Sequence, residues 1–345
     1  MLRFAAIGLD HRHIYHMVAE LIAAGAQCVG YCPQTSDPRV LDGFRERFPD
    51  LRALERGRLL DDPAIDIICC AAIPRDRAGI ALHAMANGKD VMVDKPGLTT
   101  PAQLADVMDC VARTGRIFSI CFSERFIVRA SEIAAKLVAE GAIGEVVNTV
   151  GLGPHRLNRA IRPAWFFDRA AYGGILIDIA SHQIDQFLHY TGATDAQIVA
   201  SATGNHSIPD VPDFSDFGEI LLRSRHASGY IRVDWFTPDS LPSWGDGRLT
   251  LLGTKGFIEL RKYLDIAGRP GTDHVFLSNH EGTRHIDASA EPLTYFSRFL
   301  ADVRDRTQTA ASQAHVFAVT RLSLEAEAAA ARLTPPPNPS PCLRA

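Results

Sequence analysis

The sequence has 345 residues, of which 46% are hydrophobic and 22% charged, and its 40 acidic and 36 basic side chains give a formal net charge of −4. This composition excludes a largely disordered chain, and the lack of a net positive charge argues against a protein whose whole surface binds nucleic acid. No apolar run approaches the ~20 residues that a membrane helix needs, and at roughly 150 residues per domain the length predicts two domains.

The first part of the sequence alternates apolar runs with amphipathic stretches. We expect strands over 2–8, 27–32, 64–73, 90–93 and 116–122, and helices over 14–24, 76–87 and 100–113. Thr99 or Thr100 is placed to cap the last of these helices, with Pro101 in its first turn. This alternation predicts an α/β domain over residues 1–122, with a parallel sheet between layers of helices.

The pattern changes after residue 122. A helix is expected over 126–140, and strands are expected over 145–152, 196–204, 216–224, 227–236, 247–253 and 256–261. One helix, from Gly174 to Tyr190, interrupts these strands, and two more helices follow over 292–306 and 312–333. Long strands with little helix between them predict a mostly antiparallel sheet in a second α/β domain, residues 123–333. Residues 334–345 are proline-rich, and we expect a disordered tail there.

The turn between the first strand and the first helix lies where a dinucleotide-binding turn would lie. The usual pattern is G-x-G-x-x-G, which lets the backbone approach a pyrophosphate at the N-terminus of the helix. Here Gly8 occupies the first position, Asp10 the second and His13 the third. The acidic residue that usually binds a ribose after the second strand is also absent, since Pro33 stands there. The choice between NAD and NADP therefore stays open.

Three histidines in this region, His11, His13 and His16, suggest a metal site. His13 and His16 would be neighbours on the helix surface. No nearby cysteine or carboxylate completes a set of three or four ligands in the sequence, so we expect no metal and interpret these residues as polar side chains around a helix N-terminus.

Two further segments carry chemistry. Lys95 follows the predicted strand 90–93, and the carboxyl ends of parallel strands form the edge at which ligands bind. Asp178 and His182 are four residues apart, which places them on one face of the predicted helix, and Asp185 extends that stripe. Such polar residues in an apolar helix need partners. A substrate hydroxyl would serve, and so would a buried Asp–His hydrogen bond of purely structural value.

Several of these motifs, in this order, resemble the Gfo/Idh/MocA family, named after glucose–fructose oxidoreductase, inositol dehydrogenase and rhizopine catabolism. The resemblance covers residues 2–333. It rests on the first turn and on the segments DVMVDKP (90–96), FSERF (122–126), GAIGE (141–145) and GGILIDIASHQID (173–185). Departures from the family pattern include Asp10, His13, Pro33, Asp94 in place of Glu, Arg77 where His is common, and Tyr172 in place of Gly.

The resemblance implies a Rossmann nucleotide-binding domain followed by a domain with an open-faced sheet. It implies hydride transfer between NAD or NADP and a secondary alcohol of a sugar, cyclitol or related polyol. By position, His182 would be the general base, Lys95 would hold the hydroxyl, and Asp178 would orient the substrate or the imidazole. The residues expected to bind the cofactor are Gly8, Asp10, His11, Arg12, His13, Ile73, Pro74, Asp94, Lys95 and Pro96.

Substrate contacts are also expected from a loop at the end of a second-domain strand. Its candidates are His155, Arg156, Arg162 and Trp165, which could meet hydroxyls or an acidic group, beside Lys95, Asp178 and His182. The alternative for this loop is a packed connection with solvated arginines. Residues 235–248 form a second such loop, which could line the site or a subunit contact.

Three readings of function remain open. The first is a dehydrogenase of polyols or sugar-like alcohols. The second keeps NAD tightly bound and uses transient oxidation for an elimination, a hydrolysis or an epimerisation. The third is a non-catalytic sensor or scaffold, which the glycine-poor turn favours and the set Lys95, Asp178 and His182 disfavours.

The expected partners are a small molecule and further copies of the chain. The open face of the second sheet would expose apolar surface, so we expect a homodimer or homotetramer, which the resemblance also implies. Neither a nucleic acid nor a membrane is expected. The N-terminal apolar stretch is shorter than the core of a signal peptide, and the seven cysteines include no CxxC pair, so we expect a cytoplasmic protein.

Overall fold

The computed structural model describes residues 1–333. The tail predicted over 334–345 lies outside the described residues. None of the helices within residues 1–333 combines the length and the apolar character that crossing a membrane requires.

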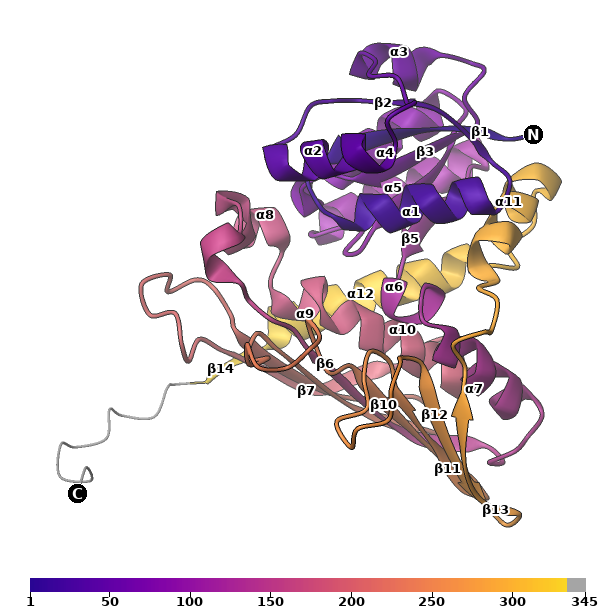
Figure 1. Ribbon diagram of the computed structural model, residues 1–345. Helices are drawn as coiled ribbons and strands as arrows, with labels where there is room; N and C mark the ends of the chain where they lie inside the picture. Colours follow the sequence, from indigo (N-terminus) through magenta and orange to yellow (C-terminus); the bar gives the residue numbers. More distant parts are fainter. Residues whose placement is uncertain (334–345) are drawn as a thin grey trace.

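The N-terminal part is a five-stranded parallel sheet covered by helices, as the sequence predicted (Figure 1). Its order is β2 (Gln27–Tyr31), β1 (Arg3–Leu9), β3 (Ile67–Ala71), β4 (Asp90–Asp94) and β5 (Phe118–Cys121). The helices α1 (His13–Ala23), α4 (Pro74–Ala86) and α5 (Pro101–Thr114) match expectation. The Thr100 side chain caps α5 by accepting a hydrogen bond from the Gln103 N–H.

Two helices in this part were not predicted, α2 (Pro38–Arg47) and α3 (Arg56–Asp61). The start of α2 has a clear signal in the sequence, because Asp37 caps it and Pro38 occupies its first turn. Only Val40 and Phe44 of this helix are buried, with Leu41 partly buried beside them, so the segment carries few apolar residues that could identify a helix.

The second sheet has nine strands in the order β13-β12-β11-β10-β6-β9-β8-β7-β14. Six of them match predicted strands: β6 (Val146–Pro154), β7 (Gln197–Gly204), β8 (Phe217–Arg223), β9 (Ser228–Asp234), β10 (Arg248–Gly253) and β11 (Gly256–Arg261). The pairs β6–β9 and β7–β14 are parallel, and the other pairs are antiparallel. The sheet is therefore mixed but mostly antiparallel, and the predicted fold class is confirmed.

The remaining strands of this sheet were missed. They are β12 (His274–Asn279), β13 (Gly282–Asp287) and β14 (Ala331–Leu333). Strand β13 is exposed over almost its whole length, so its residues lack the apolar alternation that identifies a strand. Strand β14 occupies the end of the segment 312–333 that was predicted as helix.

The helices of the second part are shorter than expected. The predicted helix 126–140 is α6 (Ser123–Phe126) and α7 (Arg129–Ala139), and the predicted helix 174–190 is α9 (Ile175–Asp178) and α10 (Ala180–Thr191). Short turns η1 (Arg159–Ile161) and η2 (Ala164–Phe167) and helix α8 (Arg169–Tyr172) precede α9. Helix α10 packs on β6 and β9, and α12 (Gln313–Ala329) packs on β7, so these helices cover one face of the sheet.

The last two helices return to the first sheet, which the sequence did not indicate. Helix α11 (Tyr295–Asp305) contacts α1, and α12 contacts α5 and β5 (Figure 1). The side chain of Gln313 accepts from the Phe118 N–H and donates to the Phe118 carbonyl oxygen, both at 3.0 Å, as a further strand would. These contacts fix the two sheets relative to each other.

A buried ion pair joins the helices α6, α10 and α12. The Asp185 carboxylate on α10, fully excluded from solvent, accepts two bonds of 2.6 Å from Arg125 and lies 2.7 Å from His315 Nε2. Burial would raise the pKa of Asp185, but Arg125 and His315 hold it well below 3.8. Asp185, which the sequence placed beside Asp178 and His182, therefore has a structural role.

We expect Asp185→Ala to lower the free energy of unfolding by about 3–5 kcal/mol, because it leaves the Arg125 charge buried and unpaired. Since the folded pKa is lowered, this contribution is present at neutral pH and is lost as the pH falls below the usual aspartate range. Chemical denaturation at several pH values measures it. Asp195→Ala, which removes an exposed pair with Arg321, is the control and should cost less than about 1 kcal/mol. Equal losses for the two variants would contradict this role.

Candidate active site

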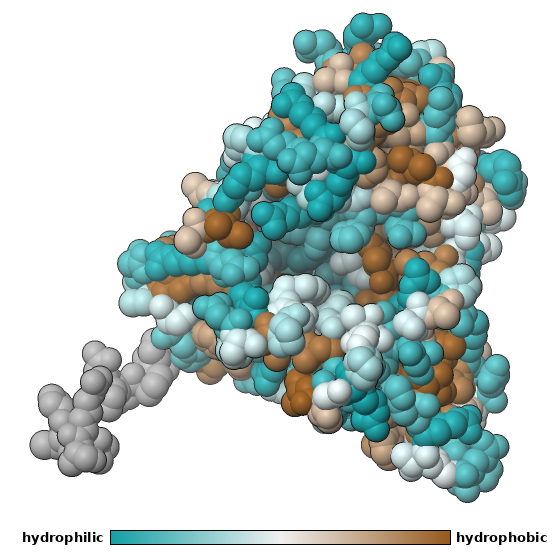
Figure 2. Space-filling view, viewed as in Figure 1, coloured by the Kyte–Doolittle hydropathy of each residue, from teal (hydrophilic) through white to brown (hydrophobic). Residues whose placement is uncertain are grey.

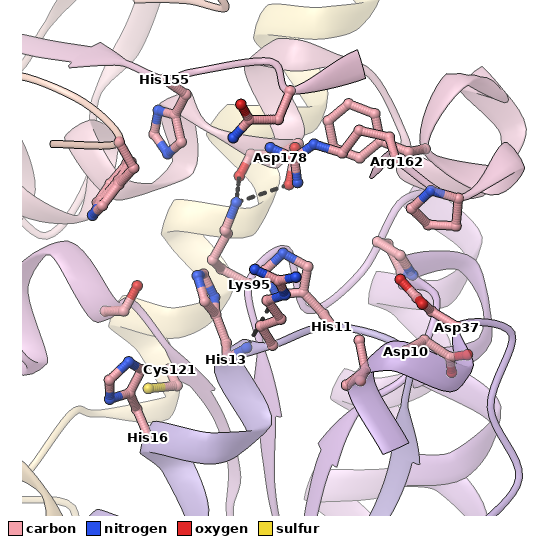
Figure 3. Close-up of a pocket in the computed structure, with 18 of the residues that line it drawn as sticks. Asp10, His11, His13, His16, Asp37, Lys95, Cys121, His155, Arg162 and Asp178 are labelled. Carbon is pink, nitrogen blue, oxygen red and sulfur yellow. Dashed lines mark hydrogen bonds and ion pairs between the residues drawn. The ribbon is translucent and has the colours of Figure 1, made fainter. Parts of the chain in front are cut away.

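A cavity of about 510 Å³ lies between the carboxyl ends of the first sheet and the covered face of the second. The space-filling view shows the molecule hollowed there (Figure 2). Its lining residues come from both halves, and Figure 3 shows Asp10, His11 and His13 on one side and His155, Arg162 and Asp178 on the other, with Lys95 between them.

The first turn keeps the backbone geometry of a nucleotide-binding loop with one glycine. Gly8 has a φ of +72°, and a Cβ atom there would lie 2.4 Å from the Cβ of Ala72. Only glycine fits this approach of β1 to the loop after β3. The N–H groups of Asp10 and His11 donate to the Ala71 carbonyl oxygen, and Arg12 caps α1 without using its side chain.

The carboxylate of Asp10 faces the loop after β2. Its Oδ1 accepts bonds of 2.6 Å from the N–H and the hydroxyl of Ser36. Asp37 next to it caps α2 and accepts from Arg39. Sequence reasoning missed this Ser36–Asp10 contact, for which the residues carry no spacing signal. The negative charge at the second glycine position is thus solvated by the protein itself.

His11 and His13 both face the buried carboxylate of Asp94. Their Nδ1 atoms lie 3.1 Å and 2.8 Å from its two oxygens, and Arg77 lies 3.2 Å away. Burial would raise the pKa of Asp94, but His13, Arg77 and His11 hold it well below 3.8. Burial, followed by the charge of His13, lowers the pKa of His11 to about 4.

His11, His13 and Asp94 have the composition of a cation site, since one possible ligand atom of each lies within 4.8 Å of the others. The carboxylate is already occupied by three nitrogen partners, and both imidazoles use Nδ1 for it. The geometry is that of an ion-pair network, and the expectation of no metal stays a prediction.

Arg77 also fixes the loop that carries Lys95. It donates bonds of 2.7 Å to the carbonyl oxygens of Ala72, Asp94 and Pro96, which flank the loops after β3 and β4. Ile73 and Pro74 begin α4 beside it, and Pro74 lines the cavity. Arg77 was noticed only as a departure from the family pattern, and its structural role could not be derived from that.

Lys95 and Asp178 meet in the cavity. The Lys95 Nζ atom donates to Asp178 Oδ1 at 2.9 Å and to the Asp178 carbonyl oxygen at 3.1 Å. Lys95 is only 5% exposed, and both residues line the cavity. The strand-end lysine and Asp178 of the following domain therefore lie together in one cavity, and their direct ion pair is a contact that the sequence did not predict.

His182 lies one turn further along the chain, but not on the same continuous helix. Ile179, with φ −104° and ψ −49°, separates α9 from α10, so the prediction of one helix from Gly174 to Tyr190 was wrong. His182 is 1% exposed, and it does not line the cavity formed by the described residues. Its Nδ1 atom has no hydrogen-bond partner within residues 1–333. Burial, followed by the charge of Lys95, lowers its pKa well below 6.5.

His155, at the end of β6, does line the cavity. Its Nδ1 atom lies 3.0 Å from the Gly153 carbonyl oxygen, which can only accept, so the proton resides on Nδ1 and Nε2 keeps its lone pair. The rings of Trp235 and Trp244 hold the imidazole at centroid distances of 5.3 and 4.5 Å. Burial and Lys95 lower its pKa well below 6.5, so the ring is neutral at pH 7.

The other predicted substrate contacts, Trp165, Arg162 and Arg156, all line the cavity but differ in the partners of their side chains. Trp165 and Arg162 line the cavity, and the Trp165 Nε1 atom has no partner in the described part of the chain. Arg156 also reaches the cavity wall, but its Nη2 atom donates to the carbonyl oxygens of Pro238, Leu241 and Ser243. These bonds hold the loop 235–248 in place. The role of Arg156 as a substrate ligand stays a prediction.

The parallel sheet of the N-terminal part, with a cavity at the carboxyl ends of its strands, defines the class of the protein as one with an N-terminal Rossmann domain. Sequence profiles support the class. Residues 44–122 match the oxidoreductase family with an NAD-binding Rossmann fold, and residues 132–259 match the GFO/IDH/MocA C-terminal domain. The chain belongs to the Gfo/Idh/MocA family. The matched residues begin after the glycine-poor first turn.

Comparisons with individual proteins agree with the family assignment. The chain is 26% identical over 313 residues to scyllo-inositol 2-dehydrogenase (NAD⁺) of Bacillus subtilis, covering 86% of this chain and 85% of the relative. It is 29% identical over 190 residues to levoglucosan dehydrogenase of Pseudarthrobacter phenanthrenivorans, covering 54% and 46%. The crystal structure of a protein from Erwinia carotovora atroseptica matches this chain with a TM-score of 0.93 and 46% sequence identity, covering 97% of this chain and all of that chain.

Proposed function

We propose that the protein is an NAD(P)-dependent dehydrogenase that oxidises or reduces a secondary alcohol of a sugar, cyclitol or related polyol. The observation that carries this proposal is the ammonium of Lys95, held by Asp178 inside the cavity at the carboxyl edge of the first sheet. The names of the inositol and levoglucosan dehydrogenases point to the same substrate class.

The residues around the first turn fit a dinucleotide. The Gly8 turn allows close backbone approach, the Asp10 charge is taken up by Ser36, and Arg12 offers a cation at the start of α1. We propose that the cofactor lies along this edge, against the segments 8–13, 73–74 and 94–96. When bound, it accepts or supplies the hydride.

The chain's own residues would handle the substrate oxygen. During oxidation the carbinol C–H bond breaks with its electron pair, the O–H proton leaves, and a carbonyl forms. We propose that Lys95 holds the hydroxyl and stabilises the negative charge that develops on its oxygen. Asp178 fixes the direction of the ammonium. His182 accepts the proton, and its neutral state at pH 7 suits that role.

His155 would bind a second substrate hydroxyl. Its bare Nε2 atom is an acceptor, and its ring is fixed between two tryptophans. Trp165 would donate its free indole N–H in the same cavity.

A dehydrogenase screen tests the proposed function. Purified protein is mixed with polyols, inositols, sugars and sugar acids in the presence of NAD or NADP, and nicotinamide absorbance is followed. We expect at least one substrate to reduce the cofactor in a 1:1 ratio with product. Product formation without a net absorbance change would favour transient oxidation instead, and failure of both nicotinamides to bind would contradict the proposal.

We further propose a cytoplasmic homo-oligomer that associates through the open face of the second sheet. Tyr230 on β9, Leu252 on β10 and Phe257 on β11 are 36–46% exposed there. Sedimentation at micromolar concentration should find dimers or tetramers. A monomer would contradict this assembly.

A further inference from the structure

One guanidinium in the cavity is held rigidly but lacks a counter-ion. Arg162 donates from Nε to the Leu157 carbonyl oxygen at 2.7 Å and from Nη2 to the Arg156 carbonyl oxygen at 3.2 Å. Its guanidinium carbon lies 4.3 Å from the ring centroid of Phe166 and 5.1 Å from that of Trp235. Carbonyl oxygens and aromatic faces thus fix its plane.

No carboxylate within residues 1–333 lies within 4.0 Å of Arg162, the limit for an ion pair. Its Nη1 atom donates to no residue of the described chain. Burial lowers the pKa of Arg162 to about 10, while the charge of Asp178 opposes this decrease. A guanidinium in such a place is costly unless an anion joins it.

The carboxylates of the cavity are already used. Asp10 accepts from Ser36, Asp37 from Arg39 and Asp178 from Lys95. They are the three carboxylates that line the cavity in the described structure.

Two other arginines of the cavity wall have partners of their own. Arg77 is bound to Asp94, and Arg156 to backbone carbonyls. Arg12 and Arg162 alone among the lining arginines lack a carboxylate partner in the described chain.

The position of Arg162 indicates which molecule supplies the anion. The Arg162 side chain extends into the cavity beside Asp178, on the side opposite Asp10 (Figure 3). Arg12, in contrast, lies at the N-terminus of α1, where a pyrophosphate would be attracted. Arg162 is thus on the side of the substrate residues, close to the Lys95–Asp178 pair.

The geometry points to a carboxylate on the substrate, bound by Arg162, so that the protein acts on a polyhydroxy acid such as an aldonic or uronic acid in preference to a neutral sugar. This inference rests on the proposed dehydrogenase function. The planar fork of a guanidinium suits a carboxylate, and a charge-assisted bond of this kind strengthens binding markedly. A phosphate of the cofactor has related chemistry and is the competing source of the anion.

The test compares matched acids and neutral sugars. Initial rates are measured with galacturonate against galactose and with gluconate against glucitol, for the wild type, Arg162→Gln and the control Arg159→Gln, which removes an exposed pair with Asp210. We expect the wild type to prefer an acid. Arg162→Gln should lower kcat/KM for that acid by about 10- to 100-fold, mainly through KM, and lower it much less for the neutral partner. Arg159→Gln should behave as the wild type. Equal use of acids and neutral sugars by the wild type would overturn the inference.

Two binding measurements distinguish a substrate carboxylate from a cofactor phosphate as the anion at Arg162. They also test the Arg162 site independently of the dehydrogenase function. Calorimetric titration with NADH and NADPH should give the same Kd for the wild type and Arg162→Gln, and a large loss of cofactor affinity with an unchanged acid preference would assign the guanidinium to a cofactor phosphate instead. Titration with galacturonate and gluconate tests the subsite without turnover. Binding of an acid that disappears in Arg162→Gln, without any nicotinamide reduction, would support the carboxylate site at Arg162 and reject the dehydrogenase function.

Discussion

Replacing His182 by alanine is expected to lower kcat by about 10²- to 10⁴-fold, the usual contribution of a general base. The proton of the substrate hydroxyl then loses its proposed acceptor, whereas substrate binding through Lys95 and His155 persists. Steady-state kinetics on the substrate found in the screen measure the effect. Because His182 is buried, His182→Gln serves as a second variant that keeps most of the volume, and thermal unfolding monitors its fold.

His155→Ala is the matched control for His182. It removes an imidazole that lines the cavity, so we expect an increase in KM with a much smaller change in kcat. The opposite result, a large loss of kcat in His155→Ala and near-normal turnover in His182→Gln, would assign the proton acceptor to His155.

The pH dependence of the oxidation rate follows from the protonation of His182. Oxidation needs a neutral imidazole, and burial together with Lys95 lowers the pKa of His182 well below 6.5. The rate should therefore be level through neutral pH and should fall only in acid, where the ring becomes protonated. An acidic limb centred above pH 6.5 would contradict this assignment.

The second large effect is expected from Lys95→Met. Removing the ammonium deletes the charge that stabilises the developing alkoxide, and comparable electrostatic donors are worth about 10²- to 10³-fold in kcat. Kinetics on the same substrate measure the loss, and Lys255→Met, which changes an exposed lysine, is the control. Near-normal kcat in Lys95→Met, with the fold intact by circular dichroism, would exclude Lys95 from the reaction.

The same variant gives a second readout. The positive charge of Lys95 is one cause of the lowered pKa of His182. In Lys95→Met the acidic limb of the residual activity should move to higher pH. A limb that stays in place would show that the two groups do not share one site.

Much of the fold was predictable because its strands carry strong patterns. Strands β1, β3 and β4 are buried on both faces and appear in the sequence as continuous apolar runs. Strand β13, in contrast, is almost wholly exposed, and no apolar period marks it. The break at Ile179 was also missed, since the residues around it are as apolar and helix-compatible as those of a continuous helix.

The residues of the candidate site were predictable only where a local sequence pattern, such as a strand end or helical spacing, indicates them. The end of a strand indicated Lys95, and helical spacing indicated Asp178, and both line the cavity. The same spacing indicated His182, which the structure buries outside the cavity lining. Contacts made across the fold had no such signal: Ser36 donates to the carboxylate of Asp10, and Arg156 donates to carbonyl oxygens of the loop 235–248. Both depend on how distant loops pack, which local spacing does not encode.

A crystal structure of the ternary complex with cofactor and an unreactive substrate analogue tests the central claim most directly. We predict that one carbinol oxygen lies within hydrogen-bond distance, about 3 Å, of both the Lys95 Nζ atom and a ring nitrogen of His182. A carbinol that contacts Lys95 while His182 stays walled off behind protein atoms would contradict the proposed chemistry.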